Sequence, residues 1–456
     1  MIVEKLRQWL GMPWLKSGNE RRPTTTTSCA EECPPMSLRE DPVAFLRMLY
    51  DTAVDAARPT FGPQHFFDLD PSRPALVLGA GKAAAAMAQA FEDAWSGPVR
   101  GLVITRRGYG KPTRHITVLE GDHPNPSEDN IRATAQLTEL AKTCRADEQV
   151  IFLVSGGGSA LLCQPVDGLT LAEKRDTIKA LMHAGADIRE INAVRRQLSK
   201  VKGGGLADMC HPHKVFTFAI SDVVGDPPLD IASGPTVPDS ATPRDALRIL
   251  KRYNVPLSDV LLDILDRDAQ PRQGATTSSP PHSYRFIGTP MTSLRAAAKA
   301  AEQHGIGTII FGDDIIGEAR DVGARHAQLA IKYANGTCPV KLPCVLLSGG
   351  ETTVTKTGGG KGGPNTEYLA SLFLHLEGHP AISALAADTD GIDGSEDNAG
   401  AVITPGTWHK ATAAGLEAAT YLGNNDCYSF FQALDSLLVT GPTFTNVNDF
   451  RAIYLE

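Results

Sequence analysis

Three features that would indicate a nucleic-acid-binding, membrane or metal-binding protein are missing from this chain of 456 residues. No run of Lys or Arg stands out, and 44 basic residues against 52 acidic ones leave a net charge of −8, so nucleic acid is not an expected partner. No stretch of about 18 apolar residues is present, which excludes a membrane span. The eight cysteines form no CxxC pair and no zinc spacing, so we interpret them as reduced thiols of a cytoplasmic protein. Small-molecule substrates are the expected partners, and a homodimer is left open.

The chain does contain enough apolar sequence for sizeable cores. Hydrophobic residues make up 42% and charged residues 21%, which is typical of a globular protein. At roughly 100–200 residues per domain, the length predicts two domains. Residues 1–37, whose polar run at 17–35 includes four consecutive threonines, are expected to be a disordered leader. A Pro/Ser/Thr/Gly-rich stretch at 268–283 predicts a linker between domains at 38–267 and 284–456.

Short β-branched runs alternate with amphipathic segments along both predicted domains. Continuous apolar strands with intervening helices favour a mostly parallel sheet covered on both faces, so the predicted fold class is two α/β domains, the first of them Rossmann-like. The expected helices include 82–95, 128–141, 171–184 and 188–202. The expected strands are 75–78, 102–105, 116–119, 150–154 and 215–220, followed by 284–287, 308–311, 344–347, 382–387, 401–404 and 437–440.

Glycine-rich turns follow several of these strands directly. In parallel sheets, ligands bind beyond the carboxyl ends of the strands, and backbone N–H groups of such turns converge on anions. A single turn of this kind is explained by steric need alone, but several together favour a polyphosphate site. The candidate phosphate- or substrate-binding residues in these turns are Gly79, Gly81, Ser155, Gly156, Gly157, Gly158, Ser159, Gly349, Gly350 and Glu351.

Lys82 follows the first turn and opens a predicted helix. A lysine is a mobile point charge suited to phosphate, whereas the helix dipole disfavours a cation at this end unless an anion lies nearby. The segment is not a Walker A loop, because no Gly-Lys pair is followed by Ser or Thr. GAGKAA matches the dinucleotide pattern GxGxxG/A, but the second strand ends at Arg106 and Arg107, not at the usual acid. Arginines there would suit an NADP phosphate, so an NAD(P)H-dependent oxidoreductase stays open.

Carboxylates follow two other strands. Asp222 comes after a buried strand without a neighbouring glycine, whereas Asp390 and Asp393 lie in DTDGIDG. That segment differs from a calcium loop, because its third acid is at position 6 and no Glu closes it. Clustered carboxylates beside a phosphate site are what Mg²⁺ requires, and one of them could accept a hydroxyl proton. Turn formation by Asp-Gly is the alternative for Asp393.

Basic residues of the predicted helix 188–202 form a further candidate group. Arg195 would bind a substrate carboxylate, and Lys200 is a candidate phosphate- or substrate-binding residue. A solvated basic helix face is the usual alternative. His123 lies in the Pro-rich stretch GDHPNPSEDN, where a structural role is at least as expected as a catalytic one.

A set of motifs occurs in the order GAGKA, DHPNP, SGGGSALL, NAVRRQLSKVKGGGLA, SDVVGDPPLDIASGPTVPD, SGGETTVT, GGPNTEYLA, DTDGIDG and GPTFTNVND. This motif set, covering about residues 38–454, resembles the class II glycerate kinases, whose C-terminal module is called the MOFRL domain. The resemblance implies an ATP- and Mg²⁺-dependent kinase that phosphorylates D-glycerate, usually at the 2-hydroxyl group. It also implies a Rossmann-like N-terminal domain, a C-terminal α/β domain and an active site between them. Some members carry the older label hydroxypyruvate reductase.

The resemblance implies that Lys82 and Asp222 serve the active site, and our hypothesis of in-line phosphoryl transfer assigns roles to them and to other candidate residues. Lys82 would neutralise charge on the transferred phosphoryl group, and Asp222 would bind Mg²⁺ or accept the hydroxyl proton. Arg195 would assist the turn at 155–159 in holding phosphate or carboxylate, and Asp390 would be a metal ligand from the second domain.

The chain departs from the family pattern at one position. Many members read GGRNQE where this chain has Gly-Gly-Pro364-Asn365-Thr-Glu, so a functional arginine is missing beside the candidate binding residue Asn365. Either Lys361 or Lys356 supplies the cation, or turnover is reduced. A non-catalytic ligand-binding relative of the kinases therefore remains a further alternative.

Overall fold

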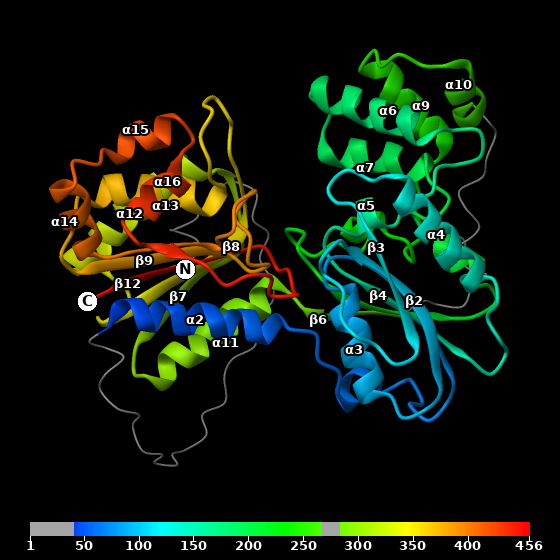
Figure 1. Ribbon diagram of the computed structural model, residues 1–456, viewed down its shortest axis with the longest axis horizontal. Coiled ribbons are helices and arrows are strands. Elements are labelled where there is room, and N and C mark those ends of the chain that lie inside the picture. The colour runs from blue at the N-terminus through cyan, green and yellow to red at the C-terminus, as the bar shows by residue number, and fades with distance from the viewer. Residues whose placement is uncertain (1–40, 267–282) are drawn as a thin grey trace.

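The computed structural model describes residues 41–266 and 283–456, which form two six-stranded sheets lying side by side (Figure 1). The two predicted α/β domains are thereby confirmed. The leader predicted at 1–37 and nearly all of the linker predicted at 268–283 lie outside the described residues. None of the helices in the described ranges is both long enough and apolar enough to span a membrane.

The first sheet has the strand order β3-β2-β1-β4-β5-β6, and every neighbouring pair is parallel. This is the order of a Rossmann fold, in which ligands bind where the order reverses, here between β1 and β4. Each predicted strand of this domain lies within an observed one. The strands are β1 (Ala75–Ala80), β2 (Val99–Arg106), β3 (Ile116–Gly121), β4 (Gln149–Val154), β5 (Val215–Ile220) and β6 (Ser283–Gly288).

Helices cover both faces of the first sheet because its strands are apolar on both sides. Ile151 and Leu153 of β4 pack with α3 (Ala84–Ala94), whereas Phe152 between them packs with α4 (Glu128–Ala141) on the other face. The second face also carries the short helices α5 (Gly158–Leu161) and α8 (Gly205–Met209). The 3₁₀ turns of this domain are η2 (Pro63–His65) and η3 (Ile231–Ser233).

A helical subdomain with its own apolar core stands above the first sheet (Figure 1). Its helices are α6 (Leu171–His183), α7 (Ile188–Gln197), α9 (Pro243–Arg252) and α10 (Asp259–Leu265). The helix predicted over 188–202 therefore ends five residues early, after Gln197. The chain then leaves the helical path because Ser199 pairs with Pro165 and the N–H of Lys200 donates to Gln164.

The second sheet is mixed, with the order β11-β10-β9-β12-β8-β7. Only β7 and β8 are parallel, and the C-terminal strand β12, which the sequence analysis did not predict, lies between β8 and β9. Its strands are β7 (Gly307–Glu318), β8 (Cys344–Thr353), β9 (Ile382–Asp388), β10 (Gly400–Ile403), β11 (Leu437–Leu438) and β12 (Asp449–Leu455).

Two helix layers enclose the second sheet. One face packs on α2 and α11, and the other on α12, α13, α14, α15 and α16, which lie above the sheet in Figure 1. Side chains of β12 alternate between these two layers, as the strand period requires. The elements are α2 (Pro42–Ala57), α11 (Pro290–Gln303), α12 (Ala319–Lys332), η5 (Tyr333–Thr337), α13 (Pro364–Leu376), α14 (Pro405–Ala413), α15 (Ala418–Gly423) and α16 (Cys427–Ala433).

The predicted domain boundaries, 38–267 and 284–456, do not match the way the chain is divided between the two sheets. Helix α2 was assigned to the first domain, but its apolar face packs against α11 and the second sheet. Strand β6 was assigned to the second domain, but it pairs with β5 at the edge of the first sheet. Both assignments relied on adjacency in sequence, whereas burial of an apolar helix face and completion of a sheet edge do not depend on it.

Candidate active site

A buried ion pair joins the two domains at the carboxyl ends of β1 and β9. The Nζ of Lys82 donates to Oδ2 of Asp390 at 2.8 Å, and the two side chains are only 15% and 4% exposed. Burial alone would lower the pKa of Lys82, but the charges of Asp390 and Asp388 outweigh it and raise that pKa above its ordinary value. Lys82 is therefore a fully charged cation held between carboxylates.

Asp222, beyond the end of β5, lies close enough to Lys82 and Asp390 for their charges to affect its pKa. Its Oδ2 accepts a hydrogen bond from Nδ2 of Asn446, which belongs to the second domain. Burial raises the pKa of Asp222 to about 6, with Lys82 acting against the rise and Asp390 adding to it. A Cβ on Gly156 would lie 1.8 Å from Oδ2 of Asp222, so only glycine allows this approach.

The two glycine turns of the first domain pack against each other. Gly81, with φ of 145°, lies so close to Ser155 that a Cβ would come within 2.2 Å of the Ser155 Oγ. The N–H of Lys82 donates to the carbonyl oxygen of Gly156 at 2.8 Å. Because β1 and β4 are neighbours, the turns that follow them meet at the point where the strand order reverses.

The turns differ in what their N–H groups can bind. In the first turn, Gly81, Lys82 and Ala83 all donate to protein oxygens at 2.8 to 3.1 Å. In the second, the N–H groups of Gly156 and Gly157 have no protein acceptor among the residues that the structure describes. An anion can therefore bind the backbone of the second turn, whereas the first turn contributes the Lys82 side chain.

The third predicted turn, after residue 347, is instead a continuation of β8. The strand extends to Thr353 and pairs with β7 over this stretch, so Gly349 and Gly350 are strand residues. Gly350 is required because a Cβ there would lie 2.2 Å from the carbonyl oxygen of Ile315. The extended pairing places Glu351 near Asp222. The surrounding protein and the charges of Asp222 and Asp449 raise the pKa of Glu351 to about 7, although its side chain still contacts solvent.

Asp393 and Asn365 are fully buried and lie next to Asp449, one of the carboxylates that raise the pKa of Glu351. The carboxylate of Asp393 accepts from the N–H groups of Asn365 and Thr366 at the start of α13, each at 2.9 Å. The side chain of Asn365 donates to Oδ1 of Asp449 at 2.6 Å. In this structure the two residues connect the start of α13 to the carboxylate of Asp449.

The position of the missing family arginine is occupied by the first residue of α13. Pro364 suits that place, because the first N–H of a helix has no partner within the helix. Lys361 forms an exposed ion pair with Glu396, 3.6 Å apart, and Lys356 is exposed.

Arg451 is a further charged residue near the site, and the sequence analysis missed it. It is 1% exposed, donates to Asp449 and to Oγ1 of Thr352, and its Nη1 donates to the carbonyl oxygen of Gly349 at 3.1 Å. The signal that could have revealed it is a single arginine within the apolar run FRAIYL, because a buried charge in a strand needs partners.

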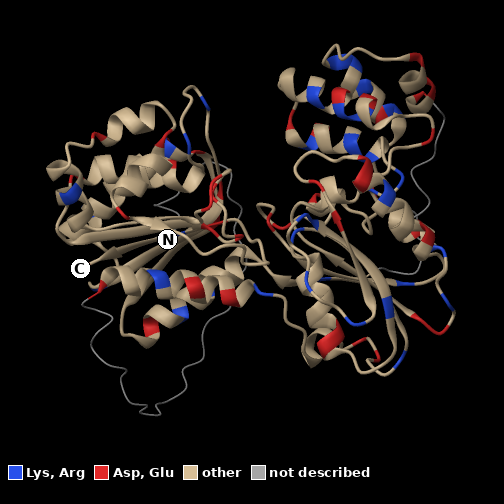
Figure 2. Cartoon of the chain, viewed as in Figure 1, with Lys and Arg blue, Asp and Glu red and all other residues tan. Residues whose placement is uncertain are grey.

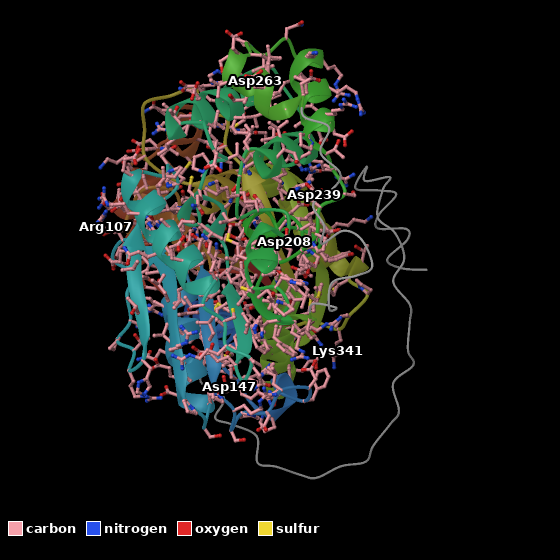
Figure 3. The ribbon with its side chains drawn as sticks, turned by 90° about the vertical axis from the view of Figure 1, so that its right-hand side faces the viewer. Arg107, Asp147, Asp208, Asp239, Asp263 and Lys341 are labelled. Carbon is pink, nitrogen blue, oxygen red and sulfur yellow. The ribbon has the colours of Figure 1, made fainter. Side chains whose placement is uncertain are left out.

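The basic residues of the 188–202 segment do not all lie together. Arg195 lines a cavity of about 750 Å³ that reaches Gly157 and Ser159. Its neighbour Arg196 binds Asp239, which is labelled in Figure 3. Lys200 forms an ion pair with Asp167 at 2.5 Å, and the Asp167 side chain is exposed.

Comparison with known proteins finds matches over most of the chain. A family model described as a domain of unknown function, DUF4147, matches residues 45–266, and the MOFRL family model matches residues 344–449.

Several curated relatives are similar over most of their length. A putative hydroxypyruvate reductase of Agrobacterium vitis is 44% identical over 83% of this chain and 99% of its own. The D-glycerate 2-kinase of Thermotoga maritima is 36% identical over 82% of this chain and 89% of its own. A crystal structure of glycerate kinase from the same organism superposes with a TM-score of 0.83 at 33% identity, covering 92% of this chain and 100% of that one.

Proposed function

The chain belongs to the glycerate kinase family that carries the MOFRL domain, and on that premise we propose that it transfers the γ-phosphoryl group of ATP to the 2-hydroxyl group of D-glycerate. The observation that carries the proposal is the meeting of the Lys82 ammonium, the Asp222 carboxylate and the N–H groups of Gly156 and Gly157 where the two domains join. Phosphoryl transfer depends chiefly on positioning and charge stabilisation, and these groups supply both.

Each group has a defined task in the transfer. Lys82 and the N–H groups of Gly156 and Gly157 stabilise the negative charge on the oxygens of the phosphoryl group in flight. Asp222 faces this group from the side of Gly156, where it orients the acceptor hydroxyl and can take its proton. A pKa of about 6 suits that task, because the carboxylate is ionised at neutral pH and still a useful base.

The acidic residues around Lys82 also fit a bound Mg²⁺. Raised pKa values of Asp222, Glu351 and Asp388 reflect burial of negative charge that Lys82 alone does not compensate. No trio of His, Cys, Asp or Glu in the described ranges forms a ready-made metal site, but Mg²⁺ typically takes only one or two protein carboxylates beside waters and substrate phosphates. Asp222 and Asp390 would hold it, and Mg²⁺ would neutralise phosphate charge.

Reduction of hydroxypyruvate is the rival function, because relatives carry that name. A dinucleotide would place its pyrophosphate on the N–H groups of the first glycine turn. Those of Gly81, Lys82 and Ala83 already donate to protein oxygens, and this favours the kinase.

The direct test is an ADP-release assay with ATP, Mg²⁺ and D-glycerate, followed by phosphorus NMR of the product. We expect ADP release that depends on D-glycerate and a product resonance of 2-phosphoglycerate. In parallel, hydroxypyruvate with NADPH or NADH should leave the nicotinamide absorbance unchanged. Oxidation of either nucleotide without any ADP release would overturn the proposal in favour of the reductase.

Gly156→Ala tests the close contact between the second turn and Asp222. The new methyl group would displace the Asp222 carboxylate, so we expect kcat/KM to fall by roughly 10²-fold, as misplacement of a reacting group by about 1 Å does. Gly359→Ala is the matched control, since a Cβ there meets nothing within 4 Å. Equal activities of the two variants would show that the Gly156–Asp222 contact has no role in turnover.

A further inference from the structure

A strongly basic cavity lies beside the second glycine turn, and the site residues described so far do not account for its positive charge. It measures about 750 Å³ and lies between that turn, the loop after β3 and the helices α6 and α7. Five basic side chains line it, and Asp176 is its single carboxylate. The basic residues of this helical region appear in blue in Figure 2, in a chain whose net charge is −8. The basic residues lining the cavity are Lys174, Arg175, Lys179, Arg195 and Lys202.

Lys174 is the most informative of these residues. Its side chain is 6% exposed, and its Nζ has no hydrogen-bond partner among the described residues. Burial, with Arg195 adding to it, lowers the pKa of Lys174, and burial lowers that of Arg195 as well. A buried ammonium group without a partner is costly, so an anion that binds beside Lys174 would stabilise its charged form.

The cavity ends at the proposed site of phosphoryl transfer. Gly157 lines it, and a Cβ on Gly157 would lie 3.1 Å from the His123 ring and 3.2 Å from the Lys82 side chain. Burial together with the charges of Lys82 and Arg106 lowers the pKa of His123 to about 4, consistent with a surplus of positive charge at this end. The cavity thus begins where the strand order reverses between β1 and β4.

Size and lining indicate which substrate the cavity takes. Pockets for drug-sized ligands measure roughly 300–1,000 Å³, far more than a three-carbon acid occupies. The excess of basic over acidic side chains matches a polyphosphate better than a single carboxylate. Leu171, Ile178 and Met182 of α6 add an apolar wall that a nucleoside can contact.

We propose that this cavity binds the nucleoside triphosphate, with its polyphosphate on Lys174, Arg195 and the Gly157 turn and its terminal phosphoryl group directed toward Lys82. The assignment rests on the proposed kinase function and adds to it the location of the nucleotide and a binding residue, Lys174.

Lys174→Met tests the proposal, because it removes the charge and keeps the length and burial of the side chain. We expect the Kd for ADP, measured by titration calorimetry without acceptor, and the KM for ATP to rise roughly 10- to 100-fold, as for loss of a hydrogen bond to a charged group. The KM for D-glycerate should rise much less. Lys142→Met, at the exposed lysine that directly follows α4, is the matched control and should leave all three constants unchanged.

The outcomes separate the alternatives. A rise confined to the KM for D-glycerate, with the Kd for ADP unchanged, would overturn the proposal and place the acceptor carboxylate in the cavity. Unchanged constants would show that the cavity is unused. Because ADP binding does not require turnover, weakened binding in Lys174→Met supports the cavity even if the wild-type protein fails to phosphorylate D-glycerate. Thermal unfolding checks the fold, and Lys174→Met should not lower the midpoint, since it removes an unpartnered buried charge.

Discussion

Replacement of Lys82 by Met is expected to reduce kcat by roughly 10³-fold, which corresponds to about 4 kcal/mol of lost transition-state stabilisation. The physical reason is that Lys82 is the cation that reaches the junction of the domains from the first glycine turn, between Asp390 and Asp222. Without it, the charge developing on the phosphoryl oxygens would lose its nearest side-chain cation and face the uncompensated carboxylates of Asp390 and Asp222. The measurement is steady-state ADP release at saturating ATP and D-glycerate.

Stability must be separated from catalysis in this variant, because Lys82→Met leaves the buried Asp390 without its cation. Breaking a buried ion pair costs roughly 3–5 kcal/mol, so the free energy of unfolding should fall. The double variant Lys82→Met/Asp390→Asn removes both charges and should recover most of that stability while remaining inactive. Turnover near the wild-type rate in either variant would remove Lys82 from the mechanism. Lys142→Met serves as the surface control.

Asp222→Asn should lower kcat by roughly 10²- to 10⁴-fold, the typical contribution of a general base. Asn has the shape of Asp but neither accepts a proton nor binds Mg²⁺ well, and its amide can still contact Asn446. Since the substitution removes a buried charge, the thermal midpoint should not fall. Activity within a few-fold of the wild type would exclude Asp222 from both roles.

A titration of Mg²⁺ in the Asp222→Asn variant distinguishes the two roles of this residue. If Asp222 holds the cation, the Mg²⁺ concentration for half-maximal rate should rise, and excess Mg²⁺ should restore part of kcat. If Asp222 takes the hydroxyl proton, that concentration should stay unchanged and excess Mg²⁺ should restore nothing. Asp226→Asn, four residues further along the same loop, is a suitable control.

The absence of the family arginine is compatible with this arrangement of charges. Pro364 begins α13 without disturbing it, and Asn365 and Thr366 still donate their N–H groups to Asp393. The predicted substitutes are not positioned as buried cations, because Lys361 pairs with Glu396 at the surface and Lys356 is exposed. Lys82 and the basic cavity around Lys174 supply positive charge from the first domain instead.

The sequence alone determined the strands of the first domain and the location of the turns that follow them. Its strands are short apolar runs that end at glycine or polar residues, so both their position and the turn after each one can be read from a window of a few residues. The rule that ligands bind beyond parallel strand ends then singled out Lys82, Asp222 and the turn at 155–159. The motif order identified the family, which the comparisons confirmed.

Tertiary structure alone decided how distant segments pair. The ion pair between Lys82 and Asp390 spans 308 positions, α2 packs on the domain that follows it, and β12 inserts at the centre of the second sheet. The same holds for the unpartnered Nζ of Lys174, which the sequence analysis did not single out. Periodicity in a short window reflects which side of an element is apolar. It does not indicate which other surface covers that side, because that choice depends on the packing free energy of the whole chain.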